Sequence, residues 1–286
     1  MLQDLSFGTL DNQYRHFLPE AGDAAVCIRG REILFRRRED GTLELPSVEQ
    51  AEAWRGGWEH WLEEPYRYVF TMQGRRYFLW LGAAGEPGDE AYTYVPAMAA
   101  REPQSRDVCF AAMTAWHLYC WYRDNRFCGR CGHVTVHDDK ERMMRCPVCG
   151  NMIFPKIAPA AIIALTHGDK LMLSKYANRE YTRYGLLAGF IEIGETAEEA
   201  VAREVMEEVG LKVKNIRYYK SQPWGIAGNL SIGYFCDLDG DDTVTLDREE
   251  LASAEWFPRD AIPAKDDGIS LTREMIRLFE EGREPR

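Results

Sequence analysis

Apolar positions in the first 105 residues fall into short runs that are separated by Gly, Glu and Arg. Runs of this length and spacing are typical of β-strands, and the clearest lie at 24–28, 33–35, 66–72 and 77–81. From 108 to about 123 the chain is rich in Ala, Trp, Tyr and Leu, which predicts a helix. We therefore expect a mostly β N-terminal domain over 1–105 and a linker helix over 106–123.

The pattern after residue 156 mixes strands with a well-delimited helix. Buried-looking runs at 160–165 and 170–174 predict two strands, and further strands follow up to residue 237. Thr196 is a candidate N-cap, and Glu199 three residues later completes a capping box. Gly210 is a typical helix stop. The sequence thus predicts a helix over 197–209 with one apolar face, formed by Ala197, Val201, Val205 and Val209.

Composition places the chain among ordinary globular proteins. Of its 286 residues, 45% are hydrophobic and 28% charged, and 35 Lys and Arg against 46 Asp and Glu give a formal net charge of −11. This balance argues against broad electrostatic binding to nucleic acid. The longest apolar run, 157–165, is far shorter than the roughly 20 residues of a membrane-spanning helix. The first residues lack the basic and apolar regions of a secretory signal, so we expect a cytoplasmic protein with no membrane partner.

Four of the eight cysteines form two C-x2-C pairs. Both pairs continue into glycine, at Gly132 and Gly150, and tetrahedral Zn²⁺ is bound by such paired thiolates. With four thiolates no coordination position stays open, so we expect one structural zinc. The alternative, a redox dithiol or two unrelated pairs, is weakened by the Cys-x-x-Cys-Gly form that both share. The predicted zinc ligands are Cys128, Cys131, Cys146 and Cys149.

Positive charge is concentrated around these cysteines. Residues 120–156 hold seven Lys or Arg against four Asp or Glu. Solvated surface charge is the simpler interpretation, and a small basic surface that faces phosphates is the alternative.

Three glutamates share one face of the predicted helix. Glu204, Glu207 and Glu208 stand at i, i+3 and i+4, where like charges destabilise a helix. Converging carboxylates suit Mg²⁺ or Mn²⁺, which bind through a few carboxylates together with substrate phosphates. An acidic solvated face is the alternative for the three residues taken alone.

The surrounding residues complete the pattern G-x5-E-x7-R-E-U-x-E-E-x-G-U, in which U is apolar. The fixed positions are Gly189, Glu195, Arg203, Glu204, Val205, Glu207, Glu208, Gly210 and Leu211. This stretch resembles the Nudix box of the Nudix hydrolases. The resemblance implies an α/β/α sandwich with a mixed sheet and cleavage of a nucleoside diphosphate linked to another group. It further implies that Glu195 and Arg203 pair to brace the loop, in a structural role that Gly189 shares.

Two further motifs resemble the NADH pyrophosphatase branch of that family, whose zinc ribbon precedes the Nudix domain. One is Phe154-Pro155-Lys-Ile-Ala-Pro159, and the other is Ser221-Gln222-Pro223-Trp224, which starts like the signature SQPWPFPxS. The resemblance implies a ribbon over 124–155 and a Nudix hydrolase domain over 156–286. Residues 1–105 resemble a Nudix-like domain in size and β character only.

The branch resemblance assigns roles by position. It implies hydrolysis of NADH or NAD⁺ to AMP plus the nicotinamide mononucleotide. The catalytic Mg²⁺ or Mn²⁺ would be held by Ala188 (through its backbone), Glu204, Glu207, Glu208 and Glu250, with Glu249 as the alternative to Glu250. Substrate would contact Phe154, Phe190, Gln222, Trp224 and Thr272. Phe154 and Phe190 would sandwich the adenine, and Trp224 would come from the second subunit of a homodimer.

The chain departs from the signature directly after Trp224. It reads Gly225-Ile-Ala-Gly228 where the signature has Pro-Phe-Pro-x, and this change predicts a more flexible loop. Other diphosphate substrates therefore remain alternatives: ADP-ribose, dinucleoside polyphosphates, or the NAD cap of RNA. A zinc-ribbon nucleic-acid-binding module with an inactive Nudix domain is a further alternative. An inactive domain would be expected to lack some of the fixed residues of the Nudix box, and here all of them are present.

Overall fold

The computed structural model describes residues 3–4, 10–54, 64–82, 85–98, 106–178, 183–263 and 268–285. Contacts between Cα atoms divide the chain into two units, each of which is considered separately below. One unit holds 157–224 and 229–286; the other holds 2–156 together with 225–228.

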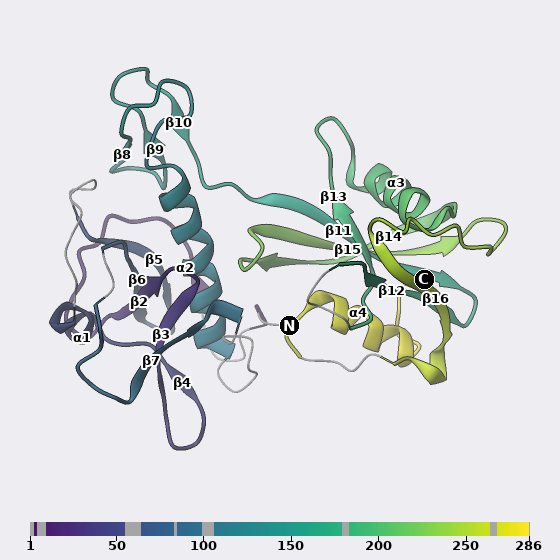
Figure 1. The fold of residues 1–286 in the computed structure, drawn as a ribbon, viewed down its shortest axis with the longest axis horizontal. Coiled ribbons are helices and arrows are strands. Elements are labelled where there is room, and N and C mark those ends of the chain that lie inside the picture. The colour runs from purple at the N-terminus through teal and green to yellow at the C-terminus, as the bar shows by residue number, and fades with distance from the viewer. Residues whose placement is uncertain are drawn as a thin grey trace. The chain divides into compact units, whose positions relative to one another are not determined.

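The C-terminal unit is built on a six-stranded mixed sheet (Figure 1). Strand β11 lies at its centre, parallel to β15 on one side and antiparallel to β12 and β13 on the other. The order is β14-β15-β11-β12-β16, with β13 also paired to β11. The strands are β11 (Ala158–His167), β12 (Lys170–Tyr176), β13 (Leu187–Phe190), β14 (Val213–Trp224), β15 (Asn229–Leu238) and β16 (Leu251–Pro258).

Alternate residues of β11 face opposite cores, each of which is closed by a helix. Ala161, Ile163 and Leu165 pack with α3 (Ala197–Val209). Ile162 and Ala164 pack with α4 (Leu271–Glu280). Because side chains of a strand alternate between its two faces, this arrangement is an α/β/α sandwich, as expected. The short helix η3 (Arg259–Ala261) follows β16.

Helix α3 has the predicted bounds and both predicted caps. The Thr196 side chain accepts a hydrogen bond from the Glu199 amide, and the Glu199 side chain accepts one from the Thr196 amide, which completes the capping box. Gly210 ends the helix in the left-handed region with φ 70°, a conformation that favours glycine.

Helix α4 was not predicted from the sequence. Its N-cap is Ser270, whose side chain accepts from the Arg273 amide. Gln222 of β14 holds the start of this helix: its Nε2 donates to the Ile269 carbonyl at 2.8 Å, and its Oε1 accepts from the Leu271 amide at 2.7 Å. With 1% of its surface exposed, Gln222 is a buried link between β14 and α4.

The N-terminal unit holds a second, seven-stranded sheet of order β1-β5-β6-β2-β3-β4, with β7 paired to β3. Its strands are β1 (Leu10–Asp11), β2 (Ala24–Arg29), β3 (Glu32–Arg37), β4 (Leu43–Glu44), β5 (Tyr66–Met72), β6 (Arg75–Trp80) and β7 (Tyr92–Pro96). The predicted strands at 24–28, 33–35, 66–72 and 77–81 correspond to β2, β3, β5 and β6. The short helix α1 (Val48–Ala53) packs on this sheet through Val48 and Ala51.

Helix α2 (Arg106–Asp124) leads from this sheet into the cysteine segment and agrees with the predicted helix. Its buried face includes Phe110, Met113 and Trp121. Among the described residues, no helix has the length and apolarity to span a membrane. The cysteine segment forms a separate three-stranded sheet of β8 (Val136–His137), β9 (Met144–Arg145) and β10 (Met152–Ile153).

The Gln222 link predicts a measurable loss of stability. In Gln222→Met the volume is kept, but the Leu271 amide and the Ile269 carbonyl lose their buried partner. We expect the free energy of unfolding to fall by about 1–3 kcal/mol, the typical cost of unsatisfied buried polar groups. Urea denaturation measures it. The control is Tyr218→Phe on the same strand, where the side chain is exposed and a change within about 0.5 kcal/mol is expected. Equal losses in both variants would contradict the link.

Candidate active site and zinc centre

The four predicted zinc ligands lie together. The Sγ atoms of Cys128, Cys131, Cys146 and Cys149 are all within 4.8 Å of one another. Two of the Sγ–Sγ distances are 3.6 Å (Cys128–Cys149) and 3.4 Å (Cys131–Cys146). A tetrahedron with Zn–S bonds of about 2.3 Å has sulfur atoms roughly 3.8 Å apart. The cluster therefore fits one zinc ion with four thiolate ligands.

The turns around the cysteines favour the thiolate form. Gly132 and Gly150 both have positive φ, at 76° and 71°, and close turns in which their amides donate to the carbonyls of Cys128 and Cys146. Although desolvation acts in the opposite direction, the amides of Arg130 and Cys131 help to lower the pKa of Cys128 to about 6. Amide groups aimed at sulfur stabilise its negative charge, as a metal ligand requires.

On α3 the box glutamates differ in their surroundings. Glu204 and Glu208, one turn apart, are both buried, whereas Glu207 is exposed. Burial raises the pKa of Glu204, the Arg203 guanidinium lowers it, and the charges of Glu207 and Glu250 raise it again. Carboxylate oxygens are the ligands that hard divalent ions prefer, so the chemistry of this donor set fits Mg²⁺ or Mn²⁺. Among the described residues, the four cysteines are the only group of three or more His, Cys, Asp or Glu whose ligand atoms all lie within 4.8 Å of one another.

Arg203 connects the loop before α3 with two of these carboxylates. Its Nε and one terminal nitrogen donate to the two oxygens of Glu195 at 2.7 and 2.9 Å. The other terminal nitrogen donates to Glu204 at 2.8 Å and to Glu207 at 2.9 Å. The Arg203 contact holds the pKa of Glu195 down at about 2. The sequence indicated the pair with Glu195, but it did not indicate that Arg203 also contacts two of the proposed metal ligands.

Strand β13 places backbone directly against Glu204. A Cβ atom added to Gly189 would lie 1.9 Å from the Glu204 Cδ. Ala188, the predicted backbone ligand, precedes it on the same strand. Only glycine leaves room for the Glu204 carboxylate at this position.

Glu250 and Glu249 are the two candidates for the metal ligand outside the Nudix box, and Glu250 interacts more closely with the glutamates of the box. Its charge contributes to the raised pKa of Glu204. Its carbonyl accepts from the Ala177 amide at 2.8 Å. Glu249 has a different local contact, in which its amide donates to Asp247.

The predicted substrate residues fall into two groups. Phe154 and Phe190 are 53% and 54% exposed, so packing in a core does not account for either ring. Trp224 is half-buried at the end of β14, and Thr272 is half-buried in the first turn of α4. Gln222, in contrast, is buried, and both ends of its amide are engaged by the backbone around Ser270. The Gly225–Gly228 segment forms a turn between β14 and β15, closed by a hydrogen bond from the Gly228 amide to the Gly225 carbonyl.

Two known domain families match the residues that form this fold, the box glutamates and the cysteine cluster. Residues 156–279 match the NUDIX domain, and residues 123–154 match the NADH pyrophosphatase zinc ribbon domain. Residues 123–279 thus match a NUDIX domain directly preceded by a zinc ribbon of the NADH pyrophosphatase type.

Curated relatives match the same part of the chain. The NAD-capped RNA hydrolase NudC of Klebsiella pneumoniae (strain 342) is 40% identical over 157 residues, which cover 54% of this chain and 60% of the relative. The protein of the same name from Shigella dysenteriae serotype 1 (strain Sd197) is 42% identical over 156 residues, with the same two coverages. The match thus spans about three fifths of these relatives' length.

Among solved structures, a NUDIX hydrolase from Nitrosomonas europaea is similar over 55% of this chain and 91% of its own. Its sequence identity is 23% and its TM-score 0.48.

The cysteine cluster predicts a fixed zinc content. Because four thiolates close the tetrahedron, we expect one zinc ion per chain and its loss in Cys146→Ser, with a lower melting temperature. Elemental analysis of the purified protein measures this content. Cys120→Ser, which changes a free cysteine of α2 outside the cluster, should keep the zinc. Full zinc in Cys146→Ser would contradict the proposed ligand set.

The close approach of Gly189 to Glu204 predicts a local defect. In Gly189→Ala the new methyl group must displace the Glu204 carboxylate, so we expect divalent-cation affinity to fall at least about tenfold, as measured by Mn²⁺ titration followed by electron paramagnetic resonance. Gly185→Ala is the matched control, since its Cβ meets no atom within 4 Å. Wild-type affinity in Gly189→Ala would show that Glu204 is not a ligand.

Proposed function

We propose that the protein hydrolyses the pyrophosphate bond of NADH or NAD⁺, giving AMP and the nicotinamide mononucleotide, and that it acts on the NAD cap of RNA by the same reaction. The observation that carries this proposal is the complete Nudix box, with Glu204 and Glu208 both buried, one helical turn apart, and Glu250 close enough to affect the pKa of Glu204. The zinc ribbon of the NADH pyrophosphatase type and the similarity to NAD-capped RNA hydrolases favour this substrate class.

In this proposal Glu204, Glu207, Glu208 and Glu250, with the backbone of Ala188, would hold Mg²⁺ or Mn²⁺. A divalent ion there neutralises a diphosphate and lowers the pKa of a bound water. Arg203 holds Glu204 and Glu207 in place and, through Glu195, fixes the loop that precedes α3. The chain needs no serine or cysteine nucleophile for this reaction.

The exposed rings of Phe154 and Phe190 are proposed to stack on the adenine, since planar aromatic faces suit a purine. Thr272 is a further proposed contact, and Gln222 would support it by holding the start of α4. Trp224 is assigned to the site of a second subunit, so the active form is proposed to be a homodimer, located in the cytoplasm.

The choice among substrates is tested by competition. The protein is incubated with Mg²⁺ or Mn²⁺ and an equimolar mixture of NADH, NAD⁺ and ADP-ribose, and the products are followed by mass spectrometry. Early AMP and reduced nicotinamide mononucleotide would support the proposal. Faster loss of ADP-ribose would overturn the proposed preference for NADH or NAD⁺ but would leave the proposed hydrolytic site intact. The changed turn after Trp224 would then account for the different preference.

The proposed metal ligands predict different effects on kcat for substitutions at the adjacent residues Glu250 and Glu249. Glu207→Gln and Glu250→Gln should each lower kcat for NADH at least about 100-fold, equivalent to about 2.7 kcal/mol of transition-state stabilisation. Glu249→Gln, one residue away, should stay within about twofold of wild type. Unchanged circular dichroism excludes misfolding. The reverse order for the two neighbours would assign the distal ligand to Glu249, and near-normal activity of Glu207→Gln would refute the site.

A further inference from the structure

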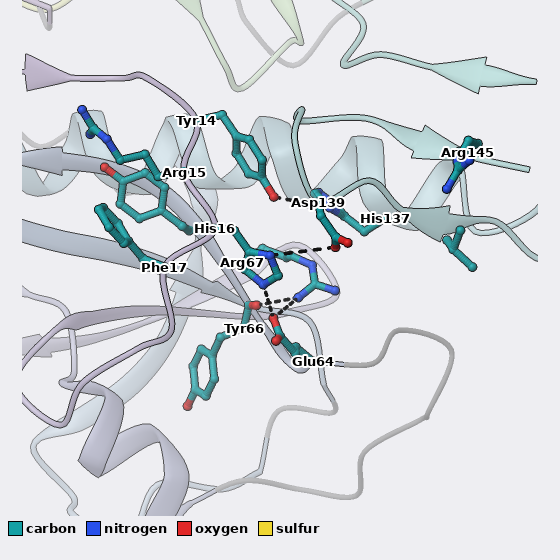
Figure 2. Close-up of a pocket in the computed structure, with 12 residues that line it drawn as sticks. Tyr14, Arg15, His16, Phe17, Glu64, Tyr66, Arg67, His137, Asp139 and Arg145 are labelled. Carbon is teal, nitrogen blue, oxygen red and sulfur yellow. Dashed lines mark hydrogen bonds and ion pairs between the residues drawn. The ribbon is translucent and has the colours of Figure 1, made fainter.

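A cavity of about 260 Å³ lies within the N-terminal unit, formed by residues outside the NUDIX domain (Figure 2). Three stretches that are distant in sequence form its walls: the extended segment 14–17, the start of β5, and strands β8 and β9 of the zinc ribbon with the turn between them. Its lining residues are Tyr14, Arg15, His16, Phe17, Glu64, Tyr66, Arg67, Tyr68, Val136, His137, Asp139 and Arg145.

One cation in this lining is buried and incompletely paired. Arg67 is 8% exposed, and one terminal nitrogen donates to Glu64 at 2.9 Å and to the Tyr66 carbonyl at 3.0 Å. Within the described residues its Nε is buried and has no hydrogen-bond partner. A buried guanidinium N–H without an acceptor is costly, and an anionic oxygen is its preferred partner.

The aromatic part of the wall is fixed and uncharged. Tyr14 and His137 have ring centroids 5.6 Å apart, and His137 Nε2 lies 2.9 Å from the hydroxyl oxygen of the buried Tyr122. Burial lowers the pKa of His137 to about 4, so its ring is neutral at pH 7. On the other side Phe17 packs edge-on against Tyr68, with centroids 5.1 Å apart. Rings that are already held in place lose little entropy when a ligand packs on them.

The lining holds three cationic and two anionic side chains, although the chain carries −11 overall. These are Arg15, Arg67 and Arg145 against Glu64 and Asp139, and Asp11, outside the lining, pairs with Arg15. The carboxylates have contacts of their own, since the His16 ring lies between them, 3.2 Å from Glu64 and 3.9 Å from Asp139. Arginine in a lining that also holds aromatic rings is typical of sites for phosphate and stacked bases.

We propose that this cavity binds a nucleoside monophosphate unit, with its phosphate on Arg67 and Arg145 and its base against the aromatic wall. The volume, slightly below the range of about 300–1,000 Å³ for drug-sized ligands, suits one nucleotide and excludes a dinucleotide. Glu64 and Asp139 can accept hydrogen bonds from ribose hydroxyls. The unit is either a free 5′-mononucleotide or one nucleotide of an RNA chain. This binding does not depend on the hydrolytic reaction proposed above.

Calorimetry without added divalent cation tests the proposal, with two probes: AMP and a 5′-phosphorylated four-nucleotide oligoadenylate. The double variant Arg15→Ala/Arg145→Ala removes the two accessible cations and should raise the Kd at least about tenfold. Arg130→Ala, which removes an exposed arginine of the ribbon outside the cavity, should stay within about twofold. If the double variant binds AMP more weakly than the wild type does, the ligand is a free nucleotide. If only its binding of the oligonucleotide is weakened, the ligand is RNA.

Arg145→Glu provides a second variant that keeps the Arg15 contact with Asp11. It should abolish binding of the same probe. NADH hydrolysis by both variants should equal that of the wild type, so failure of the proposed reaction and failure of this site are separable. The proposal is overturned if neither probe binds at 1 mM, or if the double variant and Arg145→Glu bind both probes as tightly as wild type.

Discussion

The geometry of the acidic site depends on one guanidinium group. Arg203 holds Glu195 of the preceding loop with two parallel hydrogen bonds and uses its remaining terminal nitrogen for Glu204 and Glu207. A planar group with donors in a fixed fork can position several carboxylates at once, and a lysine could not. The same side chain also donates to the Phe190 carbonyl at the end of β13. Strand, loop and helix are thereby held together by a single side chain.

Features set by local interactions were the ones that the sequence predicted well. The caps of α3 depend on Thr196, Glu199 and Gly210, all within one turn of the helix ends, and the cysteine pairs lie on two tight turns of the same form. Helix α4 was missed even though Ser270 is a regular N-cap and residues 271, 275, 276, 278 and 279 are apolar.

What the sequence could not reveal comes from long-range packing and from side-chain rotamers. The exchange of hydrogen bonds between Gln222 and the start of α4 joins residues almost fifty positions apart. The contacts of Arg203 with Glu204 and Glu207 depend on its rotamer, because spacing along the helix places all three side chains within reach without deciding which of them meet. The cavity in the N-terminal unit brings together segments around residues 15, 66 and 140, and only the last of these lies beside a recognisable motif, the cysteine pairs.

The position of β11 has a consequence for how the protein folds during synthesis. This strand follows the zinc ribbon directly, yet its long parallel partner, β15, begins only at Asn229. Long-range parallel pairing is slow because a large loop must close first. The four cysteines, in contrast, lie within 22 residues of chain. On the ribosome the ribbon can close around its metal while β11 still has one edge exposed. That edge remains a site for mispairing with other chains until β15 has emerged.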